Sequence, residues 1–288
     1  MMAEQEQRCL LAVFAHPDDE AFGVGGSLRK YADQGVRTAL ICATRGEEGE
    51  ISDPALATKE NLGQVREAEL RASCRILGVS DLSFLDYRDG ALNRADRAEA
   101  VGRIVRHIRR LRPQAVTTFD PSGVYGHPDH IAIHHLTVDA FHKAGDPAAY
   151  PEQLRHRNEG GDGLMPYAPQ KLYVGANPVS AMRTLRQEME ALGLAYAPGG
   201  NAATIPVERM GTADEDITTV IALDDREFEA KLAALHAHRT QLNPDSFVNR
   251  LSPANLRRWR GSESFVLIYP TGAPGGGQEH DLFAGVHV

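Results

Sequence analysis

Cysteine is scarce in this sequence. Its three cysteines, Cys9, Cys42 and Cys74, are widely spaced and form no C-x-x-C motif. This pattern argues against a disulfide framework and against a cysteine-ligated zinc site. Each cysteine lies in an apolar run, so we expect three buried thiols.

The sequence also lacks a long hydrophobic run and an excess of positive charge. The sequence contains no stretch of about 18 apolar residues, the length needed to span a membrane. Met1–Arg8 is polar, unlike a signal peptide. We therefore expect a cytoplasmic protein without membrane insertion. The formal net charge of −8 argues against nucleic acid as the main partner, because phosphate binding needs a basic face. A homo-oligomer is left open.

Apolar runs typical of buried strands alternate with helical periodicity in the first half of the chain. We predict strands at Cys9–Ala15, Val36–Ala43, Leu82–Leu85 and Ala115–Phe119 and helices at Gly26–Gln34, Glu60–Leu77, Arg94–Leu111 and His130–Lys143. This alternation implies a parallel sheet with crossover helices. The predicted fold class is α/β, a Rossmann-like doubly wound, mostly parallel sheet of order 3-2-1-4-5 with helices on both faces and C-terminal additions.

We predict one domain over residues 1–288. It comprises a core with the metal site at 9–144, a loop excursion at 145–170, a C-terminal part at 171–270 and a tail at 271–288. The loop is rich in glycine, proline and charge, so it either shapes specificity or is disordered. The C-terminal part should contain strands at Lys171–Gly175, Ile217–Leu223 and Ser264–Ile268 and helices at Val179–Leu192 and Arg226–His238, the second capped by Asp224–Asp225. The tail, which carries GAPGGG, should be flexible until Asp281–Gly285.

Two motifs rich in histidine and aspartate follow the first and fourth predicted strands. They are H-P-D-D-E at 16–20 and H-P-D-H at 127–130. In the predicted sheet these strands are neighbours at the topological switch point, where ligands bind. One motif alone would usually be an ordinary polar strand end or a helix cap. Two motifs at the same crevice indicate a metal site.

Imidazole and carboxylate together are typical ligands of a catalytic zinc ion, which has three protein ligands and an open position for water. We predict His16, Asp19 and His130 as these ligands, with Pro17 stiffening the turn. Ligand type alone does not fix the metal, since iron (Fe2+) also accepts two histidines and one carboxylate. The predicted cofactor is Zn2+, with Fe2+ as the alternative.

The remaining polar residues of the motifs predict the catalytic groups. Asp18 is left to act as general base toward a metal-activated water. His127 is better placed as a proton donor or charge stabiliser than as a ligand, and Asp129 should hydrogen-bond a histidine ring and fix its tautomer. Tyr125 could donate to a developing oxyanion.

These residues closely resemble a known family. A-H-P-D-D-E and G-H-P-D-H are similar to the motifs of the LmbE/PIG-L family of zinc N-deacetylases, over about Leu10 to Gln241. That family includes GlcNAc-phosphatidylinositol deacetylases, mycothiol- and bacillithiol-pathway deacetylases and the mycothiol S-conjugate amidase. The resemblance implies a Rossmann-like fold, the ligands and base named above, and removal of an acetyl group from a small-molecule amino sugar of the GlcNAc type. It also implies that Arg66, and more weakly Asp89, bind the sugar.

Several alternatives stay open beside this interpretation. T-R-G-E-E-G-E at 44–50 resembles the family's loop beside the pocket, and A-H-R-T-Q at 237–241 resembles the amidase branch, which points to a thiol-sugar S-conjugate. A metal-activated water could also attack another amide or an ester. A dinucleotide fingerprint at Gly23 to Gly26 is weak, because Leu28 stands where its third glycine belongs. A non-catalytic relative would lack a ligand or the base, and all are present.

Overall fold

Seven strands form one sheet in the computed structural model, which describes residues 7–156, 161–193, 206–243, 246–271 and 277–287. The order is β3-β2-β1-β4-β5-β7-β6. The first five of these run parallel, and β7 pairs antiparallel with β5 and β6. The predicted order 3-2-1-4-5 is confirmed, and β7 and β6 are among the C-terminal additions. The strands are β1 (Cys9–Phe14), β2 (Arg37–Cys42), β3 (Asp81–Phe84), β4 (Ala115–Thr118), β5 (Lys171–Ala176), β6 (Thr219–Ala222) and β7 (Ser262–Tyr269).

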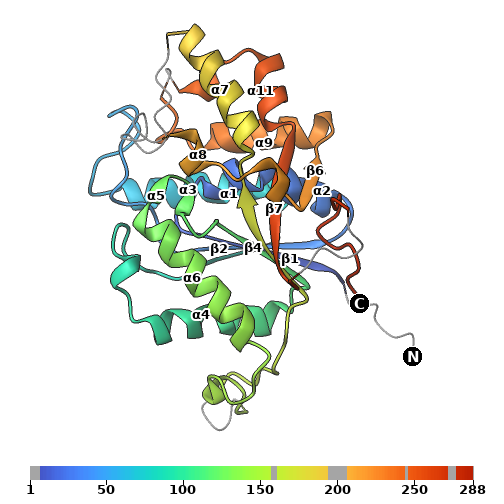
Figure 1. Cartoon of the computed structure of the whole chain (residues 1–288). Helices are drawn as coiled ribbons and strands as arrows, with labels where there is room; N and C mark the ends of the chain where they lie inside the picture. The colour runs from blue at the N-terminus through green and yellow to red at the C-terminus, as the bar shows by residue number, and fades with distance from the viewer. Residues whose placement is uncertain (1–6, 157–160, 194–205, 244–245, 272–276, 288) are drawn as a thin grey trace.

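Helices cover both faces of this sheet (Figure 1). On one face, α4 (Arg97–Leu111) packs against α6 (Pro128–Lys143). On the other, α9 (Asp225–Ala237) packs against both α2 (Gly25–Asp33) and α3 (Leu62–Leu77). The remaining helices are α1 (Asp19–Gly23), α5 (Gly123–Gly126), α7 (Val179–Ala191), α8 (Val207–Met210), α10 (Phe247–Arg250) and α11 (Pro253–Arg260), with 3-10 turns at Leu92–Arg94, Pro151–Gln153 and Asp214–Asp216.

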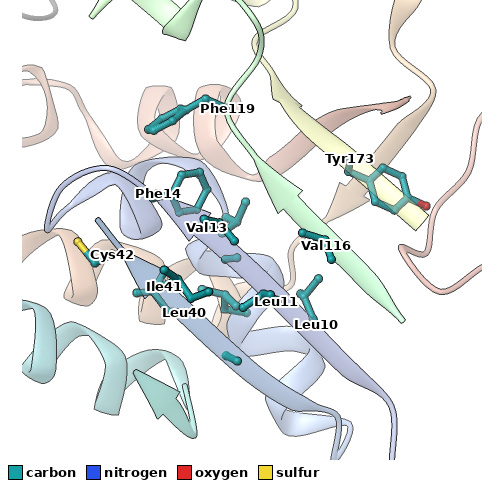
Figure 2. Packing of buried hydrophobic residues seen from close by; sticks show 14 of the residues in the cluster. Leu10, Leu11, Val13, Phe14, Leu40, Ile41, Cys42, Val116, Phe119 and Tyr173 are labelled. Atoms are coloured by element: carbon teal, nitrogen blue, oxygen red, sulfur yellow. The ribbon is translucent and has the colours of Figure 1, made fainter. Parts of the chain in front are cut away.

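The core is built around β1, all of whose residues are buried. Helices on both faces explain why this strand is a continuous apolar run rather than an alternating one. Figure 2 shows Leu10 and Leu11 of β1 beside Leu40 and Ile41 of β2 and Val116 of β4. The three cysteines are buried and free, which confirms the prediction of core thiols. This packed centre gives the motifs that follow β1 and β4 a rigid base.

Capping residues decide where several helices begin. α6 begins at Pro128, two residues before the prediction, because proline suits the first helical position and the His127 ring accepts the amide of Asp129. α4 begins at Arg97, since Asp96 caps it through the amide of Glu99. Asp224 caps α9 as predicted and forms a capping box with Glu227. The periodicity missed α1 and α11, although Ser252 before Pro253 is a cap signal for α11.

The predicted loop excursion lies at the far end of α6 from the metal motifs (Figure 1). The guanidinium of Arg109 donates to carbonyl oxygens at this end, those of Ala144, Asp146, Ala149 and Tyr150. α6 has 16 residues and is therefore about 24 Å long. The described part of the loop, 145–156 and 161–170, thus lies at the opposite end of α6 from the motif at 127–130, and its role in specificity stays a prediction.

The C-terminal tail is partly fixed to the sheet. Glu279 accepts hydrogen bonds from Lys171 Nζ at 2.7 Å and from Tyr173 Oη at 2.8 Å, both on β5. The glycine-rich stretch predicted to be flexible, 272–276, lies outside the described residues. Among the helices that are described, none has both the length and the apolar character needed to cross a bilayer.

Candidate active site

The two motifs meet at the carboxyl ends of β1 and β4, as the parallel pairing of these strands requires. His16 follows β1, Asp19 begins α1, and His130 lies in the first turn of α6. His16 Nδ1 is 3.2 Å from His130 Nε2 and 3.6 Å from Asp19 Oδ2, and His130 Nε2 is 3.5 Å from Asp19 Oδ1. Ligand atoms around a tetrahedral zinc ion are about 3.3–3.4 Å apart, given bonds of about 2.0–2.1 Å. The two histidine nitrogens are at about this spacing, and each approaches a different oxygen of Asp19, so these three side chains can meet at one ion.

Among the described residues, two groups of three have one ligand atom each, all within 4.8 Å of one another: His16 with His127 and His130, and His16 with Asp89 and Asp129. The two carboxylates of the second group are already engaged. Asp129 accepts the amides of Gly90 at 2.7 Å and Leu92 at 3.0 Å, and Asp89 accepts the amide of Glu48 at 3.1 Å. Their geometry suits partners of a ligand better than ligands.

The ring of His16 separates these two sets of carboxylates. Its Nδ1 faces Asp19 and His130, whereas its Nε2 is 3.0 Å from Asp89 Oδ1 and 3.5 Å from Asp129 Oδ2. A metal-binding histidine usually directs its second nitrogen at such a carboxylate, which fixes the tautomer. Sequence reasoning expected a hydrogen bond between Asp129 and a histidine ring; in the structure Asp129 approaches His16 Nε2 to 3.5 Å, and Asp89 lies closer to it, at 3.0 Å.

Burial and like charge perturb the titration of the group. Burial raises the pKa of Asp19 to about 7, and the neighbouring Asp18 adds to the rise although His16 opposes it. Burial, together with His16 and His127, lowers the pKa of His130 to about 2, which keeps its imidazole neutral. Crowded carboxylates beside neutral imidazole are a donor set that a divalent cation would stabilise.

Asp18 is held at the edge of this group by Arg66. Arg66 Nη2 is 3.2 Å from Asp18 Oδ2 and donates to Pro17 O at 2.6 Å, while its Nη1 donates to Gly46 O at 2.7 Å. The Arg66 side chain is only 4% exposed, so it is not a solvated charge on the surface of α3. Asp18 itself has φ 110°, a left-handed conformation that costs a non-glycine residue about 1–3 kcal/mol.

Aromatic rings close the other side of the site. The Phe119 ring stacks on the His130 ring with centroids 4.0 Å apart, and the Tyr125 ring lies edge-on to His130 at 5.3 Å. The His127 ring is 4.8 Å from the rings of both His16 and His130. Tyr125 follows Val124, whose φ of 66° is unusual for a β-branched residue. The Asp120 carboxylate supports this turn by accepting the Val124 amide at 2.9 Å.

The loop after β2 lies beside the site. Glu47 accepts the amide of Asp89 at 3.0 Å, which places the T-R-G-E-E-G-E segment next to the His16 partners. A cavity of about 730 Å³ opens between this loop, the start of α3 and the turn after β3. Its walls are rich in both signs of charge and include Arg45, Glu47, Glu48, Lys59, Asp86 and Arg88.

The residues predicted from the sequence thus gather at one place, from His16 to His130 and including Arg66 and Asp89. Sequence reasoning missed Phe119, Asp120, Glu20 and His238. Asp120 could have been found, because Asp-Pro-Ser-Gly after a strand is a turn signal. His238 lies in the A-H-R-T-Q segment but gave no spacing signal, since its partner Glu20 is 218 residues away.

Known proteins are similar to this chain in sequence. Residues 11–141, which contain both motifs, match the family described as GlcNAc-PI de-N-acetylase, PIG-L. A protein of Acidothermus cellulolyticus named 1D-myo-inositol 2-acetamido-2-deoxy-alpha-D-glucopyranoside deacetylase is 38% identical over 306 residues, covering 98% of this chain and 96% of its own length. The chain belongs to the PIG-L family. The resemblance seen in the two motifs is confirmed, and the alternative of a dinucleotide-binding protein is rejected.

Further relatives agree with membership of the PIG-L family. A protein of the same name from Streptomyces avermitilis is 35% identical over 309 residues, covering 99% of both chains. Among solved structures, N,N'-diacetylchitobiose deacetylase from Pyrococcus horikoshii matches with a TM-score of 0.65 at 22% identity, covering 91% of this chain and 84% of that one. At this identity the likeness shows a shared fold.

Proposed function

We propose that this chain is a zinc-dependent deacetylase that removes the acetyl group from the amino sugar of a GlcNAc–inositol glycoside. Amino-sugar N-deacetylation, the hydrolysis of a linear amide, is the activity named for its curated PIG-L relatives. The observation that carries the proposal is the meeting of His16, Asp19 and His130, with 3.2–3.6 Å between their nearest nitrogen and oxygen atoms, next to Asp18. The inositol aglycone comes from the names of relatives that match nearly the whole chain.

His16, Asp19 and His130 would hold the metal ion. Zinc bound there supplies a Lewis acid for the acyl carbonyl and lowers the pKa of a water molecule to about 7. The Nε2 partners of His16 support this ligand role, because they leave its Nδ1 toward the other two side chains. Fe2+ accepts the same donor set and is the alternative metal.

The remaining groups act on protons and charge. Asp18 takes a proton from the attacking water, and its carboxylate is kept in place by Arg66. His127 Nδ1 accepts the Asp129 amide at 3.2 Å, so its Nε2 carries a hydrogen and can donate a hydrogen bond to the acyl oxygen. Asp18 then passes the proton that it took from water to the leaving amine. Burial, with Asp19 and Asp18, raises the pKa of Tyr125, so its hydroxyl stays protonated and can donate to the acyl oxygen.

Substrate contacts follow from the surroundings of Asp89. The charged cavity beside Glu47 and Asp89 suits an aglycone rich in hydroxyl groups, because carboxylates accept from hydroxyls and cations donate to them. Arg66 is nearly buried and bound to Asp18 and Pro17, so we assign it to holding the base. Its contact with the sugar stays a prediction, as does that of Asp89.

The amidase alternative gains no support from the A-H-R-T-Q segment. Thr240 of this segment donates to Glu69 of α3 through its amide at 2.9 Å and its hydroxyl at 2.6 Å, and Gln241 donates to Glu50 O at 3.0 Å. These bonds join parts of the protein and do not mark a binding site for a thiol conjugate.

The test is acetate release by protein stripped of metal, with Zn2+ or Fe2+ restored. The substrates are GlcNAc–inositol, free N-acetylglucosamine, N,N'-diacetylchitobiose and a thiol-sugar S-conjugate. We expect metal-restored release, fastest from GlcNAc–inositol and lost in His130→Ala. Faster cleavage of the S-conjugate would favour the amidase. No release from any substrate by protein with one bound metal per chain would overturn the proposed activity.

A further inference from the structure

Glu20, the last residue of the H-P-D-D-E motif, has a fully buried carboxylate. Both of its oxygens are used. Oε2 accepts the backbone amide of Asp18 at 3.0 Å, and Oε1 contacts the Ser73 hydroxyl and lies 2.8 Å from His238 Nε2. Three segments far apart in sequence therefore meet at this carboxylate: α1, the middle of α3 and the residue that ends α9.

The amide that Glu20 binds belongs to the strained residue of the site. Asp18 precedes α1 in a left-handed conformation with φ 110°, and no side-chain cap stabilises it from its own carboxylate. A backbone conformation of this kind persists only where the surroundings hold it. Glu20 holds the Asp18 main chain, and Arg66 holds the Asp18 carboxylate at 3.2 Å. Asp18 is thus held both at its main chain and at its carboxylate, and these two contacts together fix the direction of its side chain.

His238 and Ser73 in turn fix Glu20. The His238 side chain is 1% exposed, and its contact with Glu20 is made without solvent access. Burial lowers the pKa of His238, but the charge and hydrogen bond of Glu20 outweigh it and raise the pKa above its ordinary value. A protonated His238 would balance the Glu20 charge beside the crowded carboxylates of the site.

We propose that Glu20, oriented by His238 and Ser73, is a positioning residue that holds Asp18 in the conformation needed for its action as base. This inference rests on the proposed function for the role of Asp18, but the claim about the turn does not depend on the substrate. It gives the A-H-R-T-Q segment a function through His238, without contact with the sugar or the metal.

The alternative is that His238 only attaches α9 to α1 and α3. Thr240→Val is the matched control, because Thr240 lies two residues away, is equally buried and makes its bonds to Glu69 rather than to Glu20. Thr240→Val removes the hydroxyl bond to Glu69 and keeps the amide bond, so it weakens the same attachment and leaves the Asp18 turn untouched. His238→Leu removes the bond to Glu20, whereas His238→Gln can keep it, since the glutamine amide nitrogen can replace Nε2.

The experiment measures hydrogen exchange of the Asp18 amide, metal content, thermal unfolding, kcat and KM for the full-length proteins. In His238→Leu we expect exchange at Asp18 to accelerate by about tenfold or more, the size expected when a charge-assisted hydrogen bond weakens. We expect kcat to fall about 10²-fold, the effect of a small misplacement of a catalytic group, with KM and bound metal unchanged. His238→Gln should restore both, and Thr240→Val should lower only the melting temperature.

Unchanged Asp18 exchange and kcat in a destabilised His238→Leu protein would overturn the proposal and leave an attachment role. If His238→Leu does not fold, Glu20→Gln gives the same comparison, because it keeps the shape and removes the charge. If the wild type releases no acetate but the Asp18 amide still exchanges faster in His238→Leu than in the wild type, the proposed function is contradicted. The proposal that Glu20 and His238 hold the Asp18 turn is not.

Discussion

Asp129 and Asp89 face the same nitrogen of His16, and replacing each by asparagine separates structural from metal-directed effects. Asp129 is fully buried and accepts two backbone amides, from Gly90 at 2.7 Å and Leu92 at 3.0 Å. Asparagine has a single carbonyl oxygen, so one amide would face an NH₂ group and lose its acceptor. An unpaired buried amide costs about 1–3 kcal/mol. We therefore expect Asp129→Asn to lower the free energy of unfolding of the metal-free protein by about 2 kcal/mol.

Asp89→Asn should be much less destabilising. The Asp89 carboxylate accepts one backbone amide, from Glu48 at 3.1 Å, and an asparagine carbonyl can replace it. We expect a loss below about 1 kcal/mol. The NH₂ group would then face His16 Nε2, which is 3.0 Å from Asp89 Oδ1. Outer carboxylates typically contribute about 10–100-fold to metal affinity, so both variants should bind zinc about 10–100-fold more weakly.

Zinc affinity is measured by competition with a chromophoric chelator, and stability by urea unfolding of the metal-free proteins. A wild-type zinc affinity in Asp89→Asn, together with a raised KM, would refute the orienting role and support the sugar contact predicted from the sequence. An Asp129→Asn protein as stable as wild type would show that the Gly90 and Leu92 amides do not depend on this carboxylate.

Three further predictions test the base, a buried ion pair and the thiols. Asp18→Asn should lower kcat about 10²–10⁴-fold in acetate release while metal analysis still finds zinc; near-native turnover would exclude Asp18 as base. Glu263→Gln should lower the free energy of unfolding in urea by about 3–5 kcal/mol, because it leaves the buried Lys231 without its carboxylate partner. Lys231→Met should lower it less, since Glu263 still accepts two backbone amides of α2. A larger loss in Lys231→Met than in Glu263→Gln would contradict this. Burial raises the pKa of the Cys9 thiol to about 12, and it also raises the pKa values of the Cys42 and Cys74 thiols. A disulfide reagent at pH 8 should therefore modify only the unfolded protein. Rapid modification of the native protein would contradict this burial.

The parallel core could be predicted because its signals are local. Buried strands such as Cys9–Phe14 are continuous apolar runs, and the right-handed crossover rule then limits how they are ordered. The additions β6 and β7 could not be ordered in this way. β7 pairs antiparallel with both β5 and β6 over long sequence separations, and no turn signal or period sets that register.

The meeting of the two histidine- and aspartate-rich motifs could be predicted because the parallel pairing of β1 and β4 brings them together. The contacts of Arg66 and Asp89 could not be predicted in the same way. A charged residue on a helix and an aspartate in a turn both have ordinary explanations. Only the folded chain shows that Arg66 is 4% exposed against Asp18 and that Asp89 approaches His16.

The site is also held by a stripe of polar residues that periodicity analysis assigns to solvent. Arg66, Glu69 and Ser73 lie on one face of α3, three and four residues apart. They contact, in turn, Asp18, Thr240 and Glu20. Buried polar side chains such as these are stable only when each has a hydrogen-bond partner. Two of the three contacts involve the A-H-R-T-Q segment: Glu69 binds Thr240 directly, and Glu20, which Ser73 contacts, also contacts His238. The position of the proposed base at the start of the chain therefore depends on where α9 ends, more than 200 residues later.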